Sequence, residues 1–215
     1  MIPALIVPVL TRYELLTDFV ARIDYPVAQL VVIDNGNQKP SIQSDFVESV
    51  SVVSVPFNLG VPASWNLGIK VTPLASYWLI SNFDVAIPAG GLQRIHEQAK
   101  TDAVVLSGVP GRFFCFTVGE KVIEWVGLFC EGIYPAYFED NDFHHRCNVM
   151  GIPVIDSGVQ VEHANSSTPH SSNDFISRNN VTFQSNGAFF EQKKALGDIS
   201  AGEWSLLTVR KNRWT

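Results

Sequence analysis

Residues 4–36, ALIVPVLTRYELLTDFVARIDYPVAQLVVIDNG, decide the fold class because they join two apolar runs through an amphipathic segment. The first run, residues 4–10, is apolar throughout, as expected of a strand covered on both faces. The second run, residues 29–36, is another buried strand that ends in a polar turn. Between them, residues 14–23 carry one apolar helical stripe: Leu15, Leu16, Phe19, Val20 and Ile23. This order predicts parallel strands joined by a crossover helix.

The same alternation continues to about residue 100. Residues 50–56 and 76–84 are predicted to be strands, and residues 62–72 and 91–100 are predicted to be helices. The resulting β-α-β-α-β order predicts a mainly parallel sheet with helices on both faces. Ligands of such sheets bind beyond the carboxyl ends of the strands. Polar side chains follow three of these strands: Thr11 and Arg12, Asp34 and Asn35, and Asn82 and Asp84.

The elements become shorter after about residue 103. Residues 103–127 are predicted to form short strands and turns, and a helix is predicted over 140–150 with Phe143, Cys147 and Met150 on its buried side. Two further strands are predicted at 151–156 and 159–164. A polar stretch rich in Ser and Asn follows and predicts a mobile loop that leads to C-terminal helices. We therefore expect one domain over residues 1–165, with residues 166–215 as an extension packed on it.

The composition excludes several classes of protein. Hydrophobic residues make up 46% of the 215 positions, so a sizeable core is expected. The net charge of −6 does not indicate nucleic acid or an anionic membrane as partner, because both need a dominant basic surface. No apolar run approaches the roughly 20 residues of a membrane span. The N-terminus lacks a basic leader region, and three cysteines without metal-ligand spacing indicate reduced thiols. We expect a cytoplasmic protein.

Asp84 is the most telling of the residues at the strand ends, because it follows a very apolar strand directly. A carboxylate at the mouth of a sheet can hold a divalent cation against a diphosphate. Asp34 taken alone is explained better by an ordinary turn, because strand ends often turn through Asp or Asn. His163 also closes a β-rich run, and a lone histidine is more often structural unless a second metal ligand lies close to it.

Residues 137–146, YFEDNDFHHR, are the most charged stretch of the chain. Glu139, Asp140 and Asp142 would occupy the first turn of the predicted helix. Acidic residues there complement the helix dipole, each by roughly 0.3–1 kcal/mol. The neighbouring aromatic residues favour a different interpretation, in which carboxylates in an apolar cleft have shifted pKa values and act as general bases. The spacing leaves both interpretations open, and it assigns no chemistry to the basic half of the stretch, residues 144–146.

Taken in order, these segments resemble a family 2 glycosyltransferase of the GT-A fold. The resemblance covers roughly residues 4–165 and is carried by LIVPVLTRYELL (5–16), LVVIDNG (30–36), NLGVPASWNLGIKV (58–71), YWLISNFDVAIP (77–88), VGLFCEGIYPAYFEDNDFHHRCNVMGIPV (126–154) and the histidine of VEHA. It implies a Rossmann-like, nucleotide-sugar-binding α/β fold with a central, mainly parallel mixed sheet flanked by helices. It also implies an inverting transfer of a sugar from a nucleoside-diphosphate sugar to an acceptor hydroxyl.

The resemblance assigns a role to each candidate residue. On the donor side it implies nucleotide or phosphate contacts by Thr11, Arg12, Asp34, Asn58, Gly60, Asn66 and Asn82. It implies Mn²⁺ or Mg²⁺ held by Asp84 and His163. On the acceptor side, Asp140 would be the general base, and Glu139 or Asp142 would orient the acceptor or the base. Residues 166–167 would add phosphate contacts, and the loop that follows would close over the donor.

The sequence departs from the family pattern at two positions. Asn82 replaces the first Asp of the metal element, and Cys130 stands where an Asp is usual. Three alternatives remain: a nucleotidyltransferase, although the Gly-rich basic loop is absent after the first strand; a glycosidase with paired carboxylates, although the parallel rhythm does not fit it; and a non-catalytic sugar-nucleotide-binding protein. The acceptor stays open among a glycan, a lipid-linked sugar, a protein, a metabolite and a modified nucleobase.

Overall fold

The computed structural model describes residues 1–163 and 173–201. Within these residues a seven-stranded sheet has the order β3-β2-β1-β4-β7-β6-β8, and β5 pairs with β9 in a separate two-stranded sheet. The strands are β1 (Leu5–Val9), β2 (Val27–Asp34), β3 (Val47–Ser54), β4 (Tyr77–Ser81), β5 (Val85–Ala86), β6 (Val104–Leu106), β7 (Cys115–Gly119), β8 (Val154–Asp156) and β9 (Glu162–His163). The helices are α1 (Tyr13–Ala21), α2 (Val61–Val71), α3 (Gly91–Gln98), α4 (Glu120–Val126), α5 (Glu139–Val149) and α6 (Asn173–Ala195).

The sheet confirms the predicted mixed and mainly parallel topology. Strands β3, β2, β1 and β4 are parallel, β7 runs antiparallel to both β4 and β6, and β8 is parallel to β6. Val9 pairs with Asp34, which pairs in turn with Ser54. The carboxyl ends of β1, β2 and β3 therefore meet at one edge of the sheet, where the sequence placed its polar residues.

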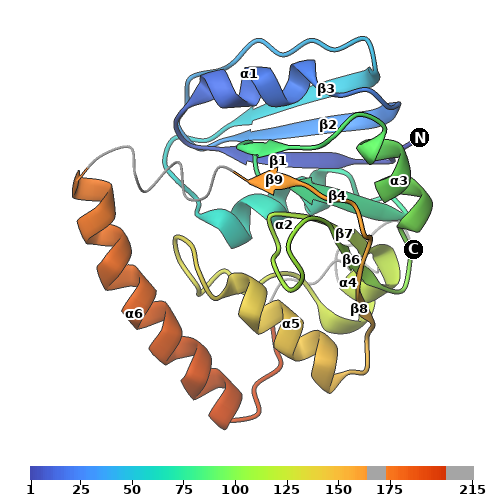
Figure 1. Cartoon of the computed structure of the whole chain (residues 1–215). Coiled ribbons are helices and arrows are strands. Elements are labelled where there is room, and N and C mark those ends of the chain that lie inside the picture. Colours follow the sequence, from blue (N-terminus) through green and yellow to red (C-terminus); the bar gives the residue numbers. More distant parts are fainter. Residues whose placement is uncertain (164–172, 202–215) are drawn as a thin grey trace, which may run out of the picture.

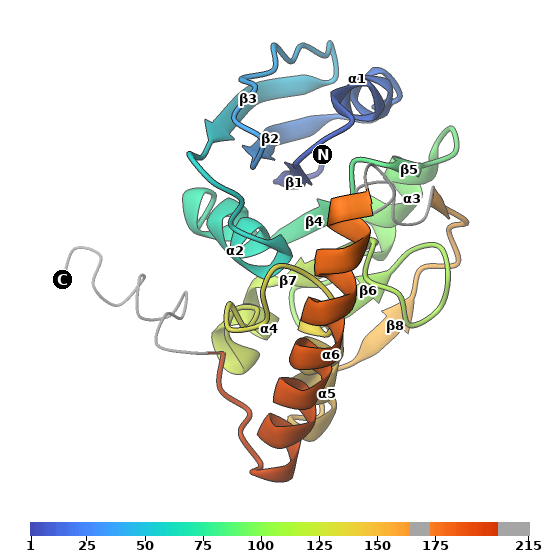
Figure 2. The ribbon, with the colours of Figure 1, turned by 90° about the vertical axis from the view of Figure 1, so that its left-hand side faces the viewer.

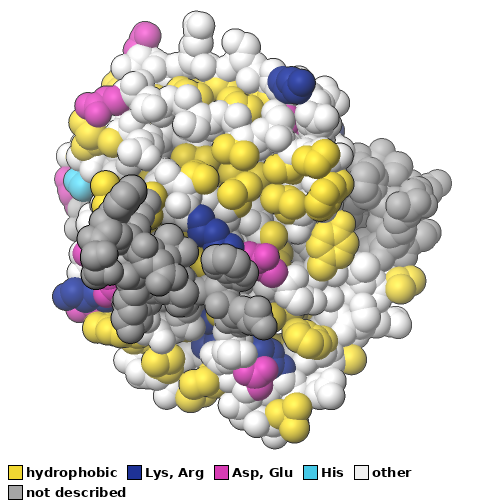
Figure 3. Space-filling view, turned by 180° about the vertical axis from the view of Figure 1, so that it is seen from behind, with side chains coloured by type: hydrophobic (Ala, Val, Ile, Leu, Met, Phe, Trp, Pro, Cys, Tyr) yellow, Lys and Arg dark blue, Asp and Glu magenta, His cyan; other side chains and the backbone are white. Residues whose placement is uncertain are grey.

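Two apolar cores cover the two faces of the sheet, as expected for continuously apolar strands. One core packs α1 and α3 against the sheet through residues such as Leu16, Phe19 and Ile95. The other packs α2, α4 and α5 against the opposite face through residues such as Trp65 and Phe143. Figure 1 shows α1 lying over the upper strands, while α5 and α6 lie at the lower end of the molecule. Seen from behind, apolar side chains gather in the upper half of the surface, and charged side chains form smaller groups below them (Figure 3).

Residues 121–127 differ from the prediction, because they form helix α4 instead of a strand. Val122, Ile123 and Val126 are buried while Trp125 is half exposed, so the apolar positions recur at helical spacing. The apolar composition of this short segment masked that spacing. The predicted strand over 159–164 is also reduced to the two residues of β9, and Met150 is exposed instead of buried.

Helix α6 lies beside α5, as both Figure 1 and Figure 2 show. Phe190 contacts the ring of His145, and Lys193 forms an ion pair with Asp142, so the two helices are joined by apolar and charged contacts. The predicted mobile loop, including residues 166–167, lies mostly outside the described residues. None of the helices in the described part of the chain has the length and apolar character needed to cross a membrane.

Candidate active site

Asp34 closes β2 and is completely buried. Its carboxylate accepts hydrogen bonds from the hydroxyls of Tyr13 and Ser54 and from the backbone N–H groups of Gln38 and Lys39. Burial by itself raises the pKa of Asp34, but these hydrogen bonds outweigh it and hold the pKa below its ordinary value. The structure therefore places Asp34 as the anchor of Tyr13 and of the turn after β2, with both oxygens engaged.

Thr11 and Arg12 form the turn between β1 and α1. Arg12 adopts a left-handed backbone conformation with φ of 58°, and its guanidinium pairs with the exposed carboxylate of Glu14. The hydroxyl oxygen of Thr11 is buried and has no hydrogen-bond partner within the described residues. An unpaired buried hydroxyl is costly, so this atom is suited to contact a bound polar group.

The segment with Asn58, Gly60 and Asn66 contacts the chain that follows α4. Asn66 is 1% exposed, and its amide bonds both the N–H and the C=O of Phe129 as well as the carboxylate of Glu131. Gly60 has φ of 80°, and a Cβ there would lie 2.8 Å from the carbonyl oxygen of Pro135. Asn58 accepts the backbone N–H of Gly60 at 2.9 Å. Asn66 and Gly60 thus help to hold residues 129–135 against α2, while the expected ligand contacts of Asn58, Gly60 and Asn66 stay predictions.

Asn82, Asp84 and His163 come together beyond the end of β4. Asp84 Oδ1 lies 3.2 Å from His163 Nε2, although the two residues are 79 positions apart. The pairing of β5 with β9 places Val85 opposite His163, which brings the histidine to the carboxylate. The amide of Asn82 lies 3.3 Å from the same imidazole nitrogen, and the ring of Phe114 stacks on the imidazole at 4.7 Å between centroids. The sequence condition for reading His163 as a ligand, a second ligand close by, is met.

The chemistry of this trio fits a divalent cation. Among residues 1–163 and 173–201, no group of three or more His, Cys, Asp or Glu side chains is placed to hold a metal ion. The protein would therefore offer a carboxylate, an imidazole and an amide, which are accepted ligands of Mn²⁺ and Mg²⁺. Two adjacent ligands about 2.1 Å from an octahedral ion lie about 3 Å apart. The separation of 3.2 Å between Asp84 Oδ1 and His163 Nε2 is that of a direct hydrogen bond, so a cation held by both groups would take the place of this bond.

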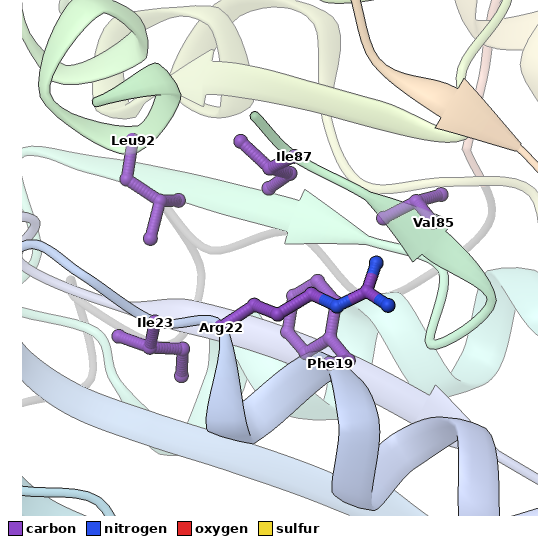
Figure 4. A pocket seen from close by; sticks show the side chains of 6 residues that line it. All are labelled: Phe19, Arg22, Ile23, Val85, Ile87 and Leu92. Carbon is purple, nitrogen blue, oxygen red and sulfur yellow. The ribbon is translucent and has the colours of Figure 1, made fainter. Parts of the chain in front are cut away.

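A pocket of about 250 Å³ opens beside this trio, between α1 and the β5–β9 pair. Its lining includes Asp84 and His163 together with Asp18 and Arg22 of α1. A neighbouring gap of about 10 Å³ lies between the end of α1 and the start of α3. Figure 4 shows Arg22 extended across this gap beside Phe19, with Val85, Ile87 and Leu92 facing it from the other side. Only the larger pocket has room for part of a ligand.

Glu139 and Asp140 open helix α5 and are the least satisfied carboxylates of the site. Glu139 is 7% exposed, and its Oε2 has no hydrogen-bond partner among the described residues. Burial, and then the charge of Asp140, raise the pKa of Glu139 to about 8. Burial also raises the pKa of Asp140, against the opposing effect of Arg112 and His144 nearby. Asp140 stays partly exposed and so remains accessible to a substrate.

Asp142 does not face a cleft, although the sequence analysis placed it there. The side chain is 1% exposed; one oxygen accepts the Nε–H of Arg146 at 2.9 Å, and the other accepts the ammonium of Lys193 at 2.6 Å. Arg146 is also completely buried, where it bonds the carbonyl oxygens of Val126 and Leu128. The helical period explains the correction: Asp142 lies one turn before Arg146 on the side of α5 that meets α6, where Lys193 reaches it.

The loop between β6 and β7 connects the two clusters of polar residues. Arg112 lies near Asp140, Phe113 packs near His144 of α5, and Phe114 stacks on His163. The acidic start of α5 and the Asp84–His163 pair thus contact consecutive residues of one loop. Asp34 and Thr11 lie at the ends of β2 and β1, and β1 is the neighbour of β4.

The sequence analysis missed four residues that shape the site: Tyr13, Ser54, Asn186 and Lys193. Tyr13 and Ser54 hold Asp34, while Asn186 and Lys193 bind the start of α5 from α6. Tyr13 follows Thr11 in the same polar turn, so its position offered a signal. Asn186 and Lys193 offered none, because their partners are about 50 residues away in the sequence.

No family model matches the sequence, and no curated protein does. Solved structures match the fold. The 1–349 fragment of S. aureus TarS aligns with 82% of this chain at a TM-score of 0.55 and 16% identity. GalNAc-T7, solved with UDP, GalNAc and Mn²⁺, aligns with 75% at 0.59 and 9% identity. The catalytic domain of Drosophila β1,4-galactosyltransferase 7, solved with xylobiose, aligns with 79% at 0.52 and 14% identity.

This chain corresponds to 63% of the TarS fragment, 43% of the GalNAc-T7 chain and 72% of the galactosyltransferase domain. The chain has the GT-A fold of these glycosyltransferases.

Proposed function

We propose that this protein is a metal-dependent, inverting glycosyltransferase that moves a sugar from a nucleoside-diphosphate sugar to an acceptor hydroxyl. The observation that carries the proposal is the Asp84–His163 pair, which a GT-A fold brings together beside a pocket at the end of β4. A carboxylate and an imidazole at such a position suit a divalent cation that is bound to a diphosphate. We place the chain among the family 2 enzymes on the ordered motifs of its sequence.

The donor side consists of Thr11, Arg12, Asn82 and the Asp84–His163 pair in this proposal. The unpartnered hydroxyl of Thr11 meets the nucleotide, and Arg12 meets a phosphate after exchanging its surface contact with Glu14. Asp34 contributes indirectly, because its engaged carboxylate fixes Tyr13 and the turn after β2. When bound, Mn²⁺ or Mg²⁺ supplies a Lewis acid that neutralises charge on the departing diphosphate.

The acceptor side is the start of α5. Asp140 is partly exposed and has a raised pKa, which strengthens it as a base, so it takes the proton of the acceptor hydroxyl. The hydroxyl oxygen then attacks the anomeric carbon on the face opposite the diphosphate, which inverts the configuration there. Glu139 stays protonated at neutral pH, and its buried carboxyl group orients the acceptor or the base through hydrogen bonds.

The ligands found in structurally similar enzymes guide the choice of donor probe. TarS has been solved with UDP-GlcNAc, and a mutant of the Drosophila galactosyltransferase with manganese and UDP-Gal. We propose a hexosyl transfer from a UDP-sugar as the first reaction to test. The acceptor class stays open between a glycan, a metabolite, a protein and a modified base.

The test is a calorimetric titration of UDP into the protein, with Mn²⁺ or with excess EDTA. We expect binding with Mn²⁺ and at least a tenfold loss with EDTA. Asp84→Asn and His163→Gln should lose the metal dependence, while Glu162→Gln, an exposed neighbour in the same pocket, should keep it. Equal UDP affinity in EDTA would remove the metal from the proposal. Absence of binding by UDP and by GDP, dTDP and CMP would remove the glycosyl transfer.

A further inference from the structure

The turn that precedes the acidic start of α5 is strained. Tyr137 and Phe138 are consecutive residues with φ of 70° and 76°. Side chains with a Cβ rarely adopt this left-handed region, and two in succession outside glycine are uncommon. Such strain persists only where surrounding contacts hold it, and it is concentrated at functional sites. Glu139 and Asp140 follow this turn directly, so its backbone sets the direction of both carboxylates.

Asn186 of α6 supplies hydrogen bonds to this turn. Its side-chain amide nitrogen lies 2.8 Å from the carbonyl oxygen of Ala136, 3.1 Å from that of Tyr134 and 3.4 Å from that of Tyr137. Asn186 itself is 6% exposed, so water does not replace these bonds readily. The two N–H groups of one amide thus hold the carbonyl oxygens of Ala136 and Tyr134, and the longer contact with the Tyr137 carbonyl shares one of these hydrogens.

Other residues on the same strip of α6 hold the turn through packing. The rings of Phe183 and Phe190 lie 5.0 Å and 6.0 Å from the ring of Phe138, centroid to centroid. A Cβ at Gly187 would lie 3.0 Å from the end of the Phe138 ring, so glycine there permits the close approach. Lys193, three residues beyond Phe190, anchors the strip to Asp142. These positions recur every three or four residues and form one helical face.

We propose that Asn186 is a positioning residue that holds the strained turn at Tyr137 and Phe138, and through it the acceptor-side carboxylates Glu139 and Asp140. Helix α6 is then part of the active site although it supplies no group to the reaction. The expected effect of Asn186 on kcat rests on the proposed function. The expected effect of Asn186 on the conformation of the turn does not, and it can be measured without any activity.

The first experiment compares Asn186→Ala with Gln184→Ala, an exposed position on the same helix. We expect Asn186→Ala to lower kcat on the order of 10²-fold, because small misplacements of a catalytic group have effects of that size. The donor KM and UDP affinity should stay within about twofold, since the donor side is built from other elements. Gln184→Ala should leave all of these values unchanged.

Two further measurements separate positioning from general stability. Amide hydrogen exchange over residues 134–142 should become faster in Asn186→Ala and stay unchanged in Gln184→Ala. The acid limb of the kcat profile should move to lower pH, because a loosened turn admits water to Asp140 and lowers its raised pKa toward the ordinary value. A purely structural role would lower the melting temperature without moving this limb.

A double-mutant cycle with Tyr137→Gly tests the strain itself. Glycine adopts positive φ without a Cβ penalty, so the effect of Asn186→Ala on exchange and on kcat should be several-fold smaller in the Tyr137→Gly background. Unchanged exchange over 134–142 in Asn186→Ala overturns the inference. A wild-type protein that transfers no sugar overturns the proposed function, while the exchange measurement still decides whether Asn186 holds the turn.

Discussion

Two buried carboxylates have pKa values that are shifted in opposite directions. Asp34 is completely buried, yet it accepts four hydrogen bonds, and its pKa is lowered. Glu139 is nearly as buried, but one of its oxygens has no partner in the described part of the chain, and its pKa rises to about 8. Burial alone therefore does not set the charge of a carboxylate. The number of donors that face it does.

The difference separates a region that stabilises the fold from the region where we propose that the reaction takes place. Around Asp34 the donors are already in place, so the carboxylate stabilises the fold and is not available to bind further groups. At the start of α5 fewer donors face the carboxylates: Oε2 of Glu139 has no partner within the described residues, and Asp140 accepts the backbone N–H of Asn141. Unsatisfied, perturbed carboxylates of this kind are typical of active sites. Asp142, two residues further on, belongs with Asp34, because two cations engage it.

Substitution of Asp142 should have the largest effect on stability. A small effect would contradict the grouping of Asp142 with the structural carboxylate Asp34. Asp142→Asn leaves the buried charges of Arg146 and Lys193 without a counter-charge, so we expect unfolding free energy to fall by about 3–5 kcal/mol. Chemical denaturation measures this loss. The matched control is Glu191→Ala, which removes the exposed pair with Lys194 and should cost less than about 0.5 kcal/mol. Equal effects of the two substitutions would contradict the structural role of Asp142.

Asp140→Asn should abolish transfer while leaving the fold intact. A general base contributes on the order of 10²–10⁴-fold to the rate, so we expect kcat to fall by that factor with UDP affinity unchanged. Initial rates with a UDP-sugar and an identified acceptor measure the effect, and Asn141→Ala, at the exposed neighbouring position, is the control. Transfer at the wild-type rate in Asp140→Asn would place the base elsewhere.

Glu139 should make stability depend on pH in the direction opposite to Asp34. Its folded pKa lies near 8, above the ordinary 4.5, so the folded state binds the proton more tightly. The resulting stabilisation is present below about pH 4.5 and is lost as pH rises through about 8. Glu139→Gln, which keeps the neutral form, should therefore raise unfolding free energy by roughly 1–3 kcal/mol at pH 9 and change it little at pH 4. A gain that is equal at both pH values would contradict the raised pKa.

Much of this architecture could be predicted from the sequence, because the signals for it lie within short stretches of the chain. Strand periodicity predicted the mainly parallel sheet, and the polar residues after β1, β2 and β4 predicted the edge of the sheet where we propose that the ligand binds. The Asp84–His163 pair could be proposed only through a family resemblance, because a two-residue pairing between β5 and β9 creates it. The separation of Asp140 from Asp142 depends on which side of α5 meets α6. That contact comes from residues some 50 positions away, which no local pattern contains.

The smallest expected effect is the loss of stability in Tyr13→Phe, which tests whether the hydrogen bonds to Asp34 stabilise the fold. Tyr13→Phe removes one of these hydrogen bonds but keeps the ring, so we expect a loss of about 1–2 kcal/mol at pH 7. The lowered pKa of Asp34 stabilises the fold above its unfolded value of 3.8, and this contribution disappears as pH falls through the folded value. The loss caused by Tyr13→Phe should therefore shrink as pH falls through the lowered folded pKa of Asp34. Denaturation curves at pH 7 and at a series of lower pH values measure this change, with Thr17→Val on the exposed face of α1 as the control. If Tyr13→Phe also weakens UDP binding tenfold or more, the turn that Asp34 anchors belongs to the donor site as well as to the fold.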